Sequence, residues 1–370
     1  MSHAHLPGSA QHTTPRLVSS DRSTFPETAR RAYAVRRIDP AAFAGLATGA
    51  GVTPRPGDVL LARVERVGDP DHLDLATGRT GALFEGDEIV VAYGEDLSHE
   101  RFEAYVPSRL VPCHLVASGG VAALIATAHD HAGTPTVLTP IGLVTDGEGA
   151  VLNLSDFALA PCGPLGPLPP VIACVGTALR AGATRAVSRL VRGLERAGSR
   201  VGVARVTGAA SGAERWLLRD AGAEVVADCT DAGHASTAAL DVETLNRAAA
   251  TLVANLRRHL LDVIVLDFAH PLTAPDTQAL LRSRAVAELA DGALIAADES
   301  SAAAGAARMV EVAGIPVIAF SGTLARSPLA VRDATRATGL PCLRFEELAQ
   351  ARRAESLFAD VCARLTGVAA

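Results

Sequence analysis

Residues 171–198, VIACVGTALRAGATRAVSRLVRGLERAG, constrain the fold more than any other part of this chain. They contain a short apolar run, a loop with two glycines and an amphipathic segment in direct succession. In that segment Val187, Leu190, Val191 and Leu194 recur at helical spacing, and arginines occupy the opposite side. A buried strand that turns through a glycine loop into a helix is the unit of a parallel sheet covered by helices. The stretch therefore predicts an α/β region.

The glycine spacing predicts what the loop binds. Gly176 is followed by five residues, Gly182, Ala183 and Thr184, which is the glycine frame and hydroxyl of a phosphate-binding loop with alanine in place of its lysine. Backbone N–H groups and the helix dipole favour a polyanion at such a helix start. We expect Gly176, Thr177, Gly182, Ala183 and Thr184 to cradle phosphates and Thr184 to hold Mg²⁺. The alternative is an ordinary glycine-rich turn.

The absence of the loop lysine is partly explained by composition, because all 34 basic residues of the chain are arginine. Arg180 and Arg185 in or beside the loop, and Arg205 from a neighbouring strand, are the candidates to replace its charge. Loss of one charge-assisted hydrogen bond to phosphate, about 1.5–3 kcal/mol, lowers nucleotide affinity by roughly 10- to 100-fold without abolishing it. Arg180 and Arg185 fit a solvated helix face equally well.

Further apolar runs alternate with helical patterns after residue 171. The expected strands share a short, buried character: 171–175, 201–206, 224–228, 263–267, 293–297, 315–320 and 341–345. Asp267 ends one of them, where open parallel sheets bind their ligands. We therefore expect this carboxylate to lie in the crevice where a ligand binds. A turn-forming or helix-capping role is the alternative.

The chain divides into four segments by composition. Residues 1–28 are polar and predicted to be a disordered tail, and residues 29–160 hold short β-like runs separated by turn residues. Within these runs the stretch 112–131 predicts a Ser-Gly-Gly turn followed by a helix. Residues 161–170, with five prolines, mark a linker, and residues 171–370 form the α/β domain.

Composition excludes some partners. The formal net charge is −6, which argues against a nucleic-acid footprint. Six cysteines show no CxxC pair, as expected in a reducing cytoplasm. The polar N-terminus and the lack of a long apolar run predict a cytoplasmic protein without a membrane segment.

The loop and two further motifs resemble P-loop NTPases of the dethiobiotin synthetase and MobB type, over residues 171–345. The segment 201–212, VGVARVTGAASG, resembles the family segment in which a lysine precedes a Thr-Gly turn; Arg205 stands at that lysine's place. The strand 260–268 resembles a Walker B strand ending in Asp267, which implies that Asp267 orders Mg²⁺ and its water. This chain departs from the family after that acid, where it has His270 and Pro271.

The resemblance implies a P-loop NTPase-like α/β domain preceded by a smaller β-rich domain, barrel-like or sandwich-like. It implies a nucleotide, ATP or GTP, and Mg²⁺, used to phosphorylate or activate a small carboxylate-like metabolite by a ligase-like, synthetase-like or kinase-like enzyme. Arg205 would orient the acceptor, and a homodimer would be expected. The alternatives are a catalytically degenerate homologue that serves as a binding or scaffold subunit for another protein, and a loop for another anion.

Weaker candidates complete the expectations. A strand-end cluster offers substrate or metal contacts, or turn formers and caps: Asp228, Cys229, Asp231 and His234. A later loop is a candidate for base contact: Ser321, Gly322 and Arg326. Two short patterns suggest a metal pair and a nucleophile, for which a surface pair and a buried thiol are the alternatives: His129 with His131, and Cys113 with His114.

Overall fold

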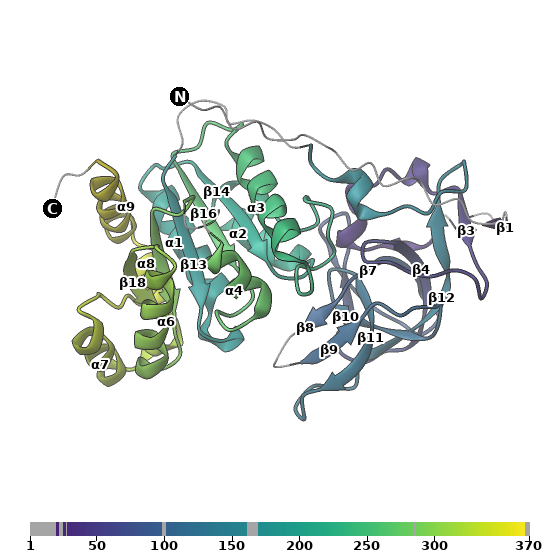
Figure 1. The fold of residues 1–370 in the computed structure, drawn as a ribbon, viewed down its shortest axis with the longest axis horizontal. Coiled ribbons are helices and arrows are strands. Elements are labelled where there is room, and N and C mark those ends of the chain that lie inside the picture. The colour runs from purple at the N-terminus through teal and green to yellow at the C-terminus, as the bar shows by residue number, and fades with distance from the viewer. Residues whose placement is uncertain are drawn as a thin grey trace.

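The computed structural model describes residues 20–21, 25–26, 28–97, 101–160, 169–283, 286 and 288–366. Figure 1 shows two regions side by side, one built from antiparallel strands and one from a parallel sheet with helices. We refer to the described residues up to 160 as the barrel region and to residues 169–366 as the sheet region. Most of the expected tail and most of the expected linker lie outside the described residues. Within the expected tail, Ser20–Asp21 instead form a strand that pairs with Gly45–Ala47, so this part is not disordered.

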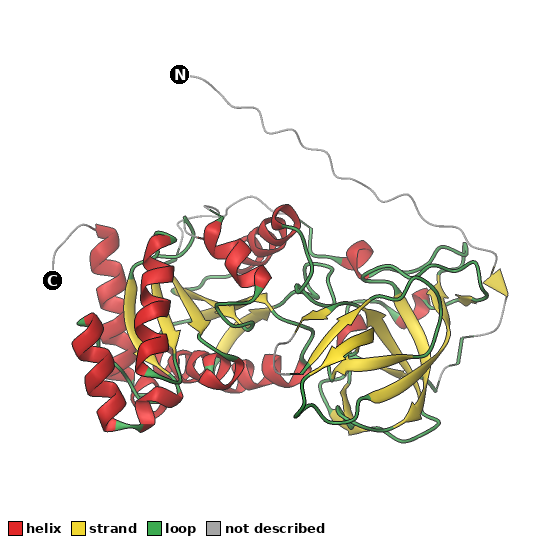
Figure 2. Ribbon diagram, turned by 60° about the horizontal axis from the view of Figure 1, so that its bottom comes forward, coloured by secondary structure: helices red, strands yellow, loops and turns green. Residues whose placement is uncertain are grey.

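The barrel region contains a ten-stranded sheet that closes on itself. Strand β4 pairs with β7 and β12, β7 pairs with β11, and β10 joins β11 to β12. The closed ring is visible in Figure 2. Its strands are β1 Ser20–Asp21, β2 Arg30–Arg31, β3 Gly45–Ala47, β4 Val59–Arg66, β7 Glu88–Tyr93, β8 Asp96–Leu97, β9 Phe102–Tyr105, β10 Cys113–Ala117, β11 Val121–Ala128 and β12 Thr136–Thr145, with β5 His72–Asp74 and β6 Thr80–Ala82 as a separate hairpin. Closure leaves the ring strands without a free edge.

The helix expected after Ser118-Gly-Gly is wrong. Residues Val121–Ala128 form β11, which pairs with β7, β9 and β10. Gly120 has φ 96°, so the chain can turn tightly from β10 into β11. The alanines of VAALIATA favour a helix locally, but pairing with three strands overrides that propensity.

The sheet region is a six-stranded parallel sheet in the order β15-β14-β16-β13-β17-β18. Its strands are β13 Val171–Gly176, β14 Val201–Thr207, β15 Ala223–Ala227, β16 Val263–Phe268, β17 Gly292–Ala296 and β18 Val317–Ser321. The first six expected strands are therefore present. Residues 341–345 are not a strand: Cys342 makes one isolated bridge to Phe320, and a helix begins at Phe345.

Helices cover both faces of this sheet. One apolar core includes residues of α1 Ala183–Arg196, α2 Gly212–Asp220, α8 Phe345–Leu348 and α9 Ala351–Thr366. The other includes residues of α3 Val242–Leu256, α4 Pro275–Arg282, α6 Ser300–Val312 and α7 Pro328–Thr338. Short 3-10 helices lie at Tyr33–Val35, Pro40–Ala42, Leu154–Phe157, Leu179–Ala181 and Thr323–Arg326. All six strands are thus buried, which explains their continuous apolar sequences.

The two regions share packing and hydrogen bonds. Ala210 and Ala235 of the sheet region belong to a core formed mostly by barrel residues. Asp74 of β5 accepts hydrogen bonds from the backbone N–H groups of Gly212 (3.0 Å) and Ala213 (3.1 Å), so a barrel residue caps helix α2. Figure 1 shows the barrel beside α2, α3 and β14, with β18 and α7 on the far side. The barrel therefore covers one half of the sheet's carboxyl edge.

Candidate functional site

The glycine loop joins β13 to α1 as a compact turn. After Gly176 the chain passes through the 3-10 turn Leu179–Ala181 to Gly182, whose φ of 89° lies in the left-handed region that favours glycine. Helix α1 then begins at Ala183 without a side-chain cap. The cap residue Gly182 thus supplies no side-chain acceptor to the first N–H groups of the helix, a condition that favours an anion at a helix start.

The side chains of the loop differ in exposure. Ala183, at the place of the P-loop lysine, is only 8% exposed. Thr184 is half-buried, whereas Arg180 and Arg185 are exposed. Thr177 donates a hydrogen bond from Oγ1 to Asp298 Oδ1 at 2.8 Å. Thus Asp298, two residues after the end of β17, lies at the loop, although the sequence analysis did not select it. Its signal was an acid close to the end of an apolar run.

Phe345 shapes the far side of the loop. A Cβ atom on Gly182 would lie 3.0 Å from the Phe345 ring, so the ring packs against this glycine. The guanidinium of Arg185 stacks over the same ring, 4.7 Å from its centroid. Arg185 thus has an aromatic partner in the sheet region, and its role in holding phosphate stays a prediction.

Asp267 and Arg205 form a buried ion pair on adjacent strands. The two residues are in register on β16 and β14, and Arg205 Nε lies 3.1 Å from Asp267 Oδ2. Arg205 also pairs with Glu214 of α2. Arg205 is 3% exposed and Asp267 is fully buried. In this arrangement Arg205 neutralises two carboxylates, and its expected contact with an acceptor stays a prediction.

One oxygen of Asp267 lacks a partner. Within the described part of the chain, Asp267 Oδ1 is buried and accepts no hydrogen bond. Burial raises the pKa of this carboxyl to about 6, although the Arg205 charge opposes the shift. An unpaired buried carboxylate oxygen is costly unless it gains a donor or a cation.

The segment after β16 contains a second polar cluster. His270 Nδ1 lies 2.7 Å from Asp276 Oδ2, and Thr237 Oγ1 donates to the same oxygen at 2.6 Å. The backbone N–H of Leu272 donates to Gly176 O at 2.7 Å, which fastens this segment to the glycine loop. The sequence analysis noted His270 only as a departure from the family. Asp276 was missed, because histidine and acid six residues apart have no periodicity that brings them together.

The strand-end candidates Asp228 and Asp231 contact the barrel region. Tyr33 donates a hydrogen bond to Asp228, and Arg36 pairs with Asp231 at 2.6 Å. Arg215 of α2 also pairs with Asp231, at 3.2 Å. Both carboxylates are buried. The turn-forming alternative is confirmed, because Asp228 accepts from the backbone N–H of Thr230 and Asp231 accepts from that of Asp228. The contact with the barrel region is a further role that the sequence analysis did not include.

The neighbouring residues Cys229 and His234 are buried in ways that reduce their reactivity. Burial raises the pKa of the Cys229 thiol and lowers the pKa of His234 to about 4. Cys113 is also fully buried, and burial raises its pKa to about 12, as the buried-thiol alternative requires.

The candidates for base contact lie in and after β18. Ser321 is fully buried, and its Oγ has no partner within the described residues. Gly322 has φ 101°, and a Cβ atom there would meet the backbone of Ala297 and Ala181. Arg326 is exposed. Gly322 thus has a packing reason to be glycine, because the glycine loop passes directly beside it.

The histidine pair expected to bind a metal ion lies close together in the structure. His129 and His131 lie beyond β11, with ring centroids 5.3 Å apart. In the described ranges, no three or more His, Cys, Asp or Glu side chains form a group that would hold a metal ion. A search of the same ranges for a helix long and apolar enough to cross a membrane finds none.

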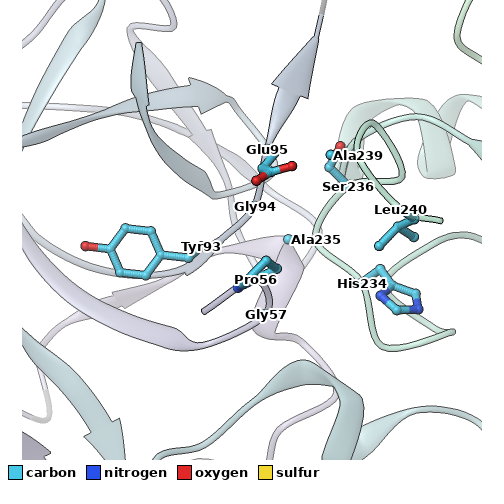
Figure 3. Close-up of a pocket in the computed structure, with 10 residues that line it drawn as sticks. All are labelled: Pro56, Gly57, Tyr93, Gly94, Glu95, His234, Ala235, Ser236, Ala239 and Leu240. Carbon is cyan, nitrogen blue, oxygen red and sulfur yellow. The ribbon is translucent and has the colours of Figure 1, made fainter. Parts of the chain in front are cut away.

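Two hollows lie outside the glycine loop. Figure 3 shows a pocket of about 50 Å³ between barrel residues such as Tyr93 and Glu95 and the sheet-region segment that includes His234 and Ser236. This volume holds a few water molecules, whereas ligand pockets are usually about 300–1,000 Å³. A second hollow, of about 470 Å³, is lined by Val242, Thr273, Pro275, Gln278, Ala279, Arg282 and Ser283. Neither hollow is lined by a residue of the glycine loop.

Comparisons with known proteins give distant likenesses only. No family model matches the chain, and no curated protein matches it. The 54 kDa protein of the signal recognition particle from Aeropyrum pernix K1, in complex with GDP, is 17% identical with a TM-score of 0.34, over 58% of this chain and 53% of that one. The cell division protein FtsY from Thermotoga maritima is 18% identical with a TM-score of 0.35, over 55% and 74%.

A nucleotide-binding protein from Archaeoglobus fulgidus, in complex with ADP, is 12% identical with a TM-score of 0.34, over 51% of this chain and 88% of that one. None of these three is a dethiobiotin synthetase or a MobB protein. Because the identities are under 25% and the TM-scores under 0.5, we draw no conclusion about function from these likenesses. The chain covers about half of the signal recognition particle protein.

Proposed function

We propose that this protein binds a nucleoside triphosphate, ATP or GTP, with Mg²⁺ at the glycine loop. The observation that supports the proposal most is the pairing of an uncapped helix start at Ala183 with a buried acid on the adjacent strand, Asp267, whose Oδ1 has no partner among the described residues. The loop amides would hold the phosphates, and Thr184 and Asp267 would hold the metal ion or its water.

The residues present fit such a group in chemistry. Mg²⁺ prefers oxygen ligands, and a hydroxyl with one or two carboxylates is a common protein contribution. Asp298 lies at the loop through its hydrogen bond from Thr177 and could supply a second carboxylate. Bound Mg²⁺ would neutralise phosphate charge, which Ala183 cannot do. In this proposal Arg205 positions Asp267 through their ion pair.

An enzyme of the ligase, synthetase or kinase type remains the first version of the proposal. The second version is a nucleotide-binding or scaffold subunit without turnover, and Ala183 together with the closed Arg205–Asp267–Glu214 group favours it. Binding tolerates the loss of one cation, whereas transition-state stabilisation depends on where that charge lies. A turnover assay separates the two versions.

Calorimetric titration with ATP and with GTP, each with and without Mg²⁺, tests the common part of the proposal. We expect binding that requires Mg²⁺ and weakens at least tenfold in Thr184→Ala and Asp267→Asn. Thr335→Ala, at an exposed position of α7, is the matched control and should bind as the wild type does. No binding of either nucleotide at millimolar concentration would overturn the proposal.

A further inference from the structure

His270 is held in a fixed orientation by a buried acid. Its ring is 13% exposed, and Nδ1 lies 2.7 Å from Oδ2 of Asp276, whose side chain is 1% exposed. Asp276 is itself fixed, because Thr237 Oγ1 donates to Oδ2 and the backbone N–H of Thr277 donates to Oδ1 at 2.8 Å. An acid with three hydrogen bonds has little freedom to turn away from the ring.

This contact decides which ring nitrogen is available. Burial raises the pKa of Asp276, but the hydrogen bond and the charge of His270 lower it by more than burial raises it. The net shift is downward, so the carboxylate is ionised and can only accept hydrogen bonds. Nδ1 of His270 therefore carries a hydrogen, and in the neutral ring Nε2 carries the lone pair. Within the described residues Nε2 has no hydrogen-bond partner. A histidine oriented through Nδ1 by a buried acid has the arrangement of a general base.

His270 lies between the glycine loop and the barrel region. Its backbone N–H donates to Thr207 Oγ1 at the end of β14, at 3.2 Å. Two residues later, Leu272 is bonded to Gly176 at the start of the glycine loop. The residues that face His270 electrostatically are Asp276 of α4, Asp96 of the barrel strand β8 and Arg205 of β14. His270 thus lies at the sheet edge between the loop and the barrel.

The groups around the ring act on its pKa in opposite directions. Burial lowers the pKa of His270, but Asp276 raises it through a hydrogen bond and charge, and Asp96 adds to that effect, so the net shift is upward. Arg205 acts in the opposite direction. A base works best when its pKa is close to the working pH.

We propose that His270 is the general base that removes the proton from a hydroxyl-bearing acceptor, and that Asp276 positions it. The inference rests on the proposed nucleotide site. The acceptor oxygen forms a bond to the γ-phosphorus, the bond from that phosphorus to the β–γ bridging oxygen breaks, and the nucleoside diphosphate leaves with the electron pair. The acceptor proton goes to Nε2 of His270. A carboxylate acceptor, already ionised at neutral pH, needs no such base; the proposal therefore changes the acceptor class expected from the sequence.

The tautomer and its acid are testable without any turnover. Nitrogen NMR of the histidines should show hydrogen on Nδ1 of His270, and Asp276→Asn should lower the His270 pKa, because Asp276 raises it through a hydrogen bond and charge. His259, in an exposed turn, supplies the matched control His259→Asn, which should leave the His270 signals unchanged. Hydrogen on Nε2 alone in the neutral ring would overturn the assignment.

The catalytic role is tested with ATP or GTP, Mg²⁺ and glycerol as the hydroxyl probe, with the phosphate ester followed by phosphorus NMR. We expect His270→Asn to keep nucleotide affinity within about threefold and to lower transfer about 10²- to 10⁴-fold. Asp276→Asn should shift the pH profile of transfer to lower pH. His259→Asn should match the wild type in both assays.

The outcomes separate the two proposals. Wild-type protein that binds no nucleotide overturns both. Protein that binds nucleotide but transfers nothing to glycerol or water, or loses no transfer in His270→Asn, overturns only the base. Phosphate release to water with no glycerol ester also contradicts the acceptor class.

Discussion

The two halves of the sheet's carboxyl edge treat charge in opposite ways. In the covered half, the ends of β14 and β15 face the barrel region, and Asp228 and Asp231 are buried with arginine and tyrosine partners. In the open half, the loops after β13 and β17 expose Arg180, Arg185 and Asp298. Arg185 stacks on Phe345 and Asp298 accepts a hydrogen bond from Thr177, but both side chains also face water. Charges in the covered half are thus committed to buried partners, whereas those in the open half keep contact with solvent.

The difference teaches where function should be sought. Buried charges without partners are expensive, so residues in the covered half are already committed to one another. Exposed charges and unpaired backbone donors cost little to keep and can exchange water for a ligand. His270 and Asp267 lie at the border, since each is largely buried and has one atom without a partner among the described residues.

The largest expected effect comes from the covered half. Arg36→Ala removes the partner of Asp231 and the cation that stacks over Tyr33 at 4.1 Å. Removing one member of a buried ion pair costs about 3–5 kcal/mol in the free energy of unfolding, and the remaining arginines place the loss near the lower value. Urea unfolding measures it. Arg63→Ala, an exposed pair with Glu88, should cost under about 1 kcal/mol. Equal losses of unfolding free energy in Arg36→Ala and Arg63→Ala would contradict the distinction between the halves.

The second effect is a pH dependence of stability that differs in sign between Asp267, at the border of the two halves, and Asp228, in the covered half. Burial raises the pKa of Asp267 to about 6, above its usual value of 3.8. The folded protein therefore holds this proton more tightly, and its contribution to stability, present below pH 4, is lost as the pH rises to 6. At about 1.4 kcal/mol per unit this is on the order of 3 kcal/mol. Asp267→Asn should remove that slope in unfolding experiments at pH 4–7; parallel curves would contradict the pKa.

Asp228 provides the opposite case. Burial alone would raise its pKa, but Arg36, Thr230 and Tyr33 together lower it to about 2. Its stabilising contribution is thus complete above pH 4 and lost only as the pH falls toward 2. Asp228→Asn should consequently flatten the acid limb of the stability curve, below the range in which Asp267 acts.

A smaller effect concerns the cap that joins the two regions. Asp74→Ala removes the acceptor for the N–H groups of Gly212 and Ala213 at the start of α2. Loss of a cap costs about 0.5–2 kcal/mol. Differential scanning calorimetry measures the change. The control Asp71→Ala removes an exposed carboxylate next to the same strand and should change the free energy of unfolding by less than about 0.5 kcal/mol. If Asp74→Ala leaves the free energy of unfolding unchanged, the barrel does not stabilise α2.

The smallest expected effect lies in the open half. Arg185→Ala loses a stacking contact with Phe345, about 0.5–1 kcal/mol at an exposed site. We expect nucleotide affinity to fall less than in Thr184→Ala, because the ring already holds the guanidinium. A tenfold or greater loss of affinity in calorimetry would instead assign Arg185 to the phosphates, as the sequence predicted.

Local patterns predicted much of the sheet region. The strand, glycine loop and helix of residues 171–196 were predictable because burial periodicity and a left-handed glycine are local properties. The segment Val121–Ala128 was misread for the same reason: its alanines are helical by propensity, and only its three pairing strands make it β11. The position of the Phe345 ring against Gly182 was likewise not predictable, because Gly182 lies far away in the sequence.

By itself the sequence determined a parallel-sheet region with a lysine-free glycine loop and an acid at the end of the adjacent strand. Only the tertiary structure decided that Arg205 faces Asp267 and Glu214, that Asp298 lies at the loop, and that Asp276 orients His270. The physical reason is range. Strand and helix formation follow from neighbours within a few residues, whereas the state of a charge is set by partners that folding brings together across the sheet edge.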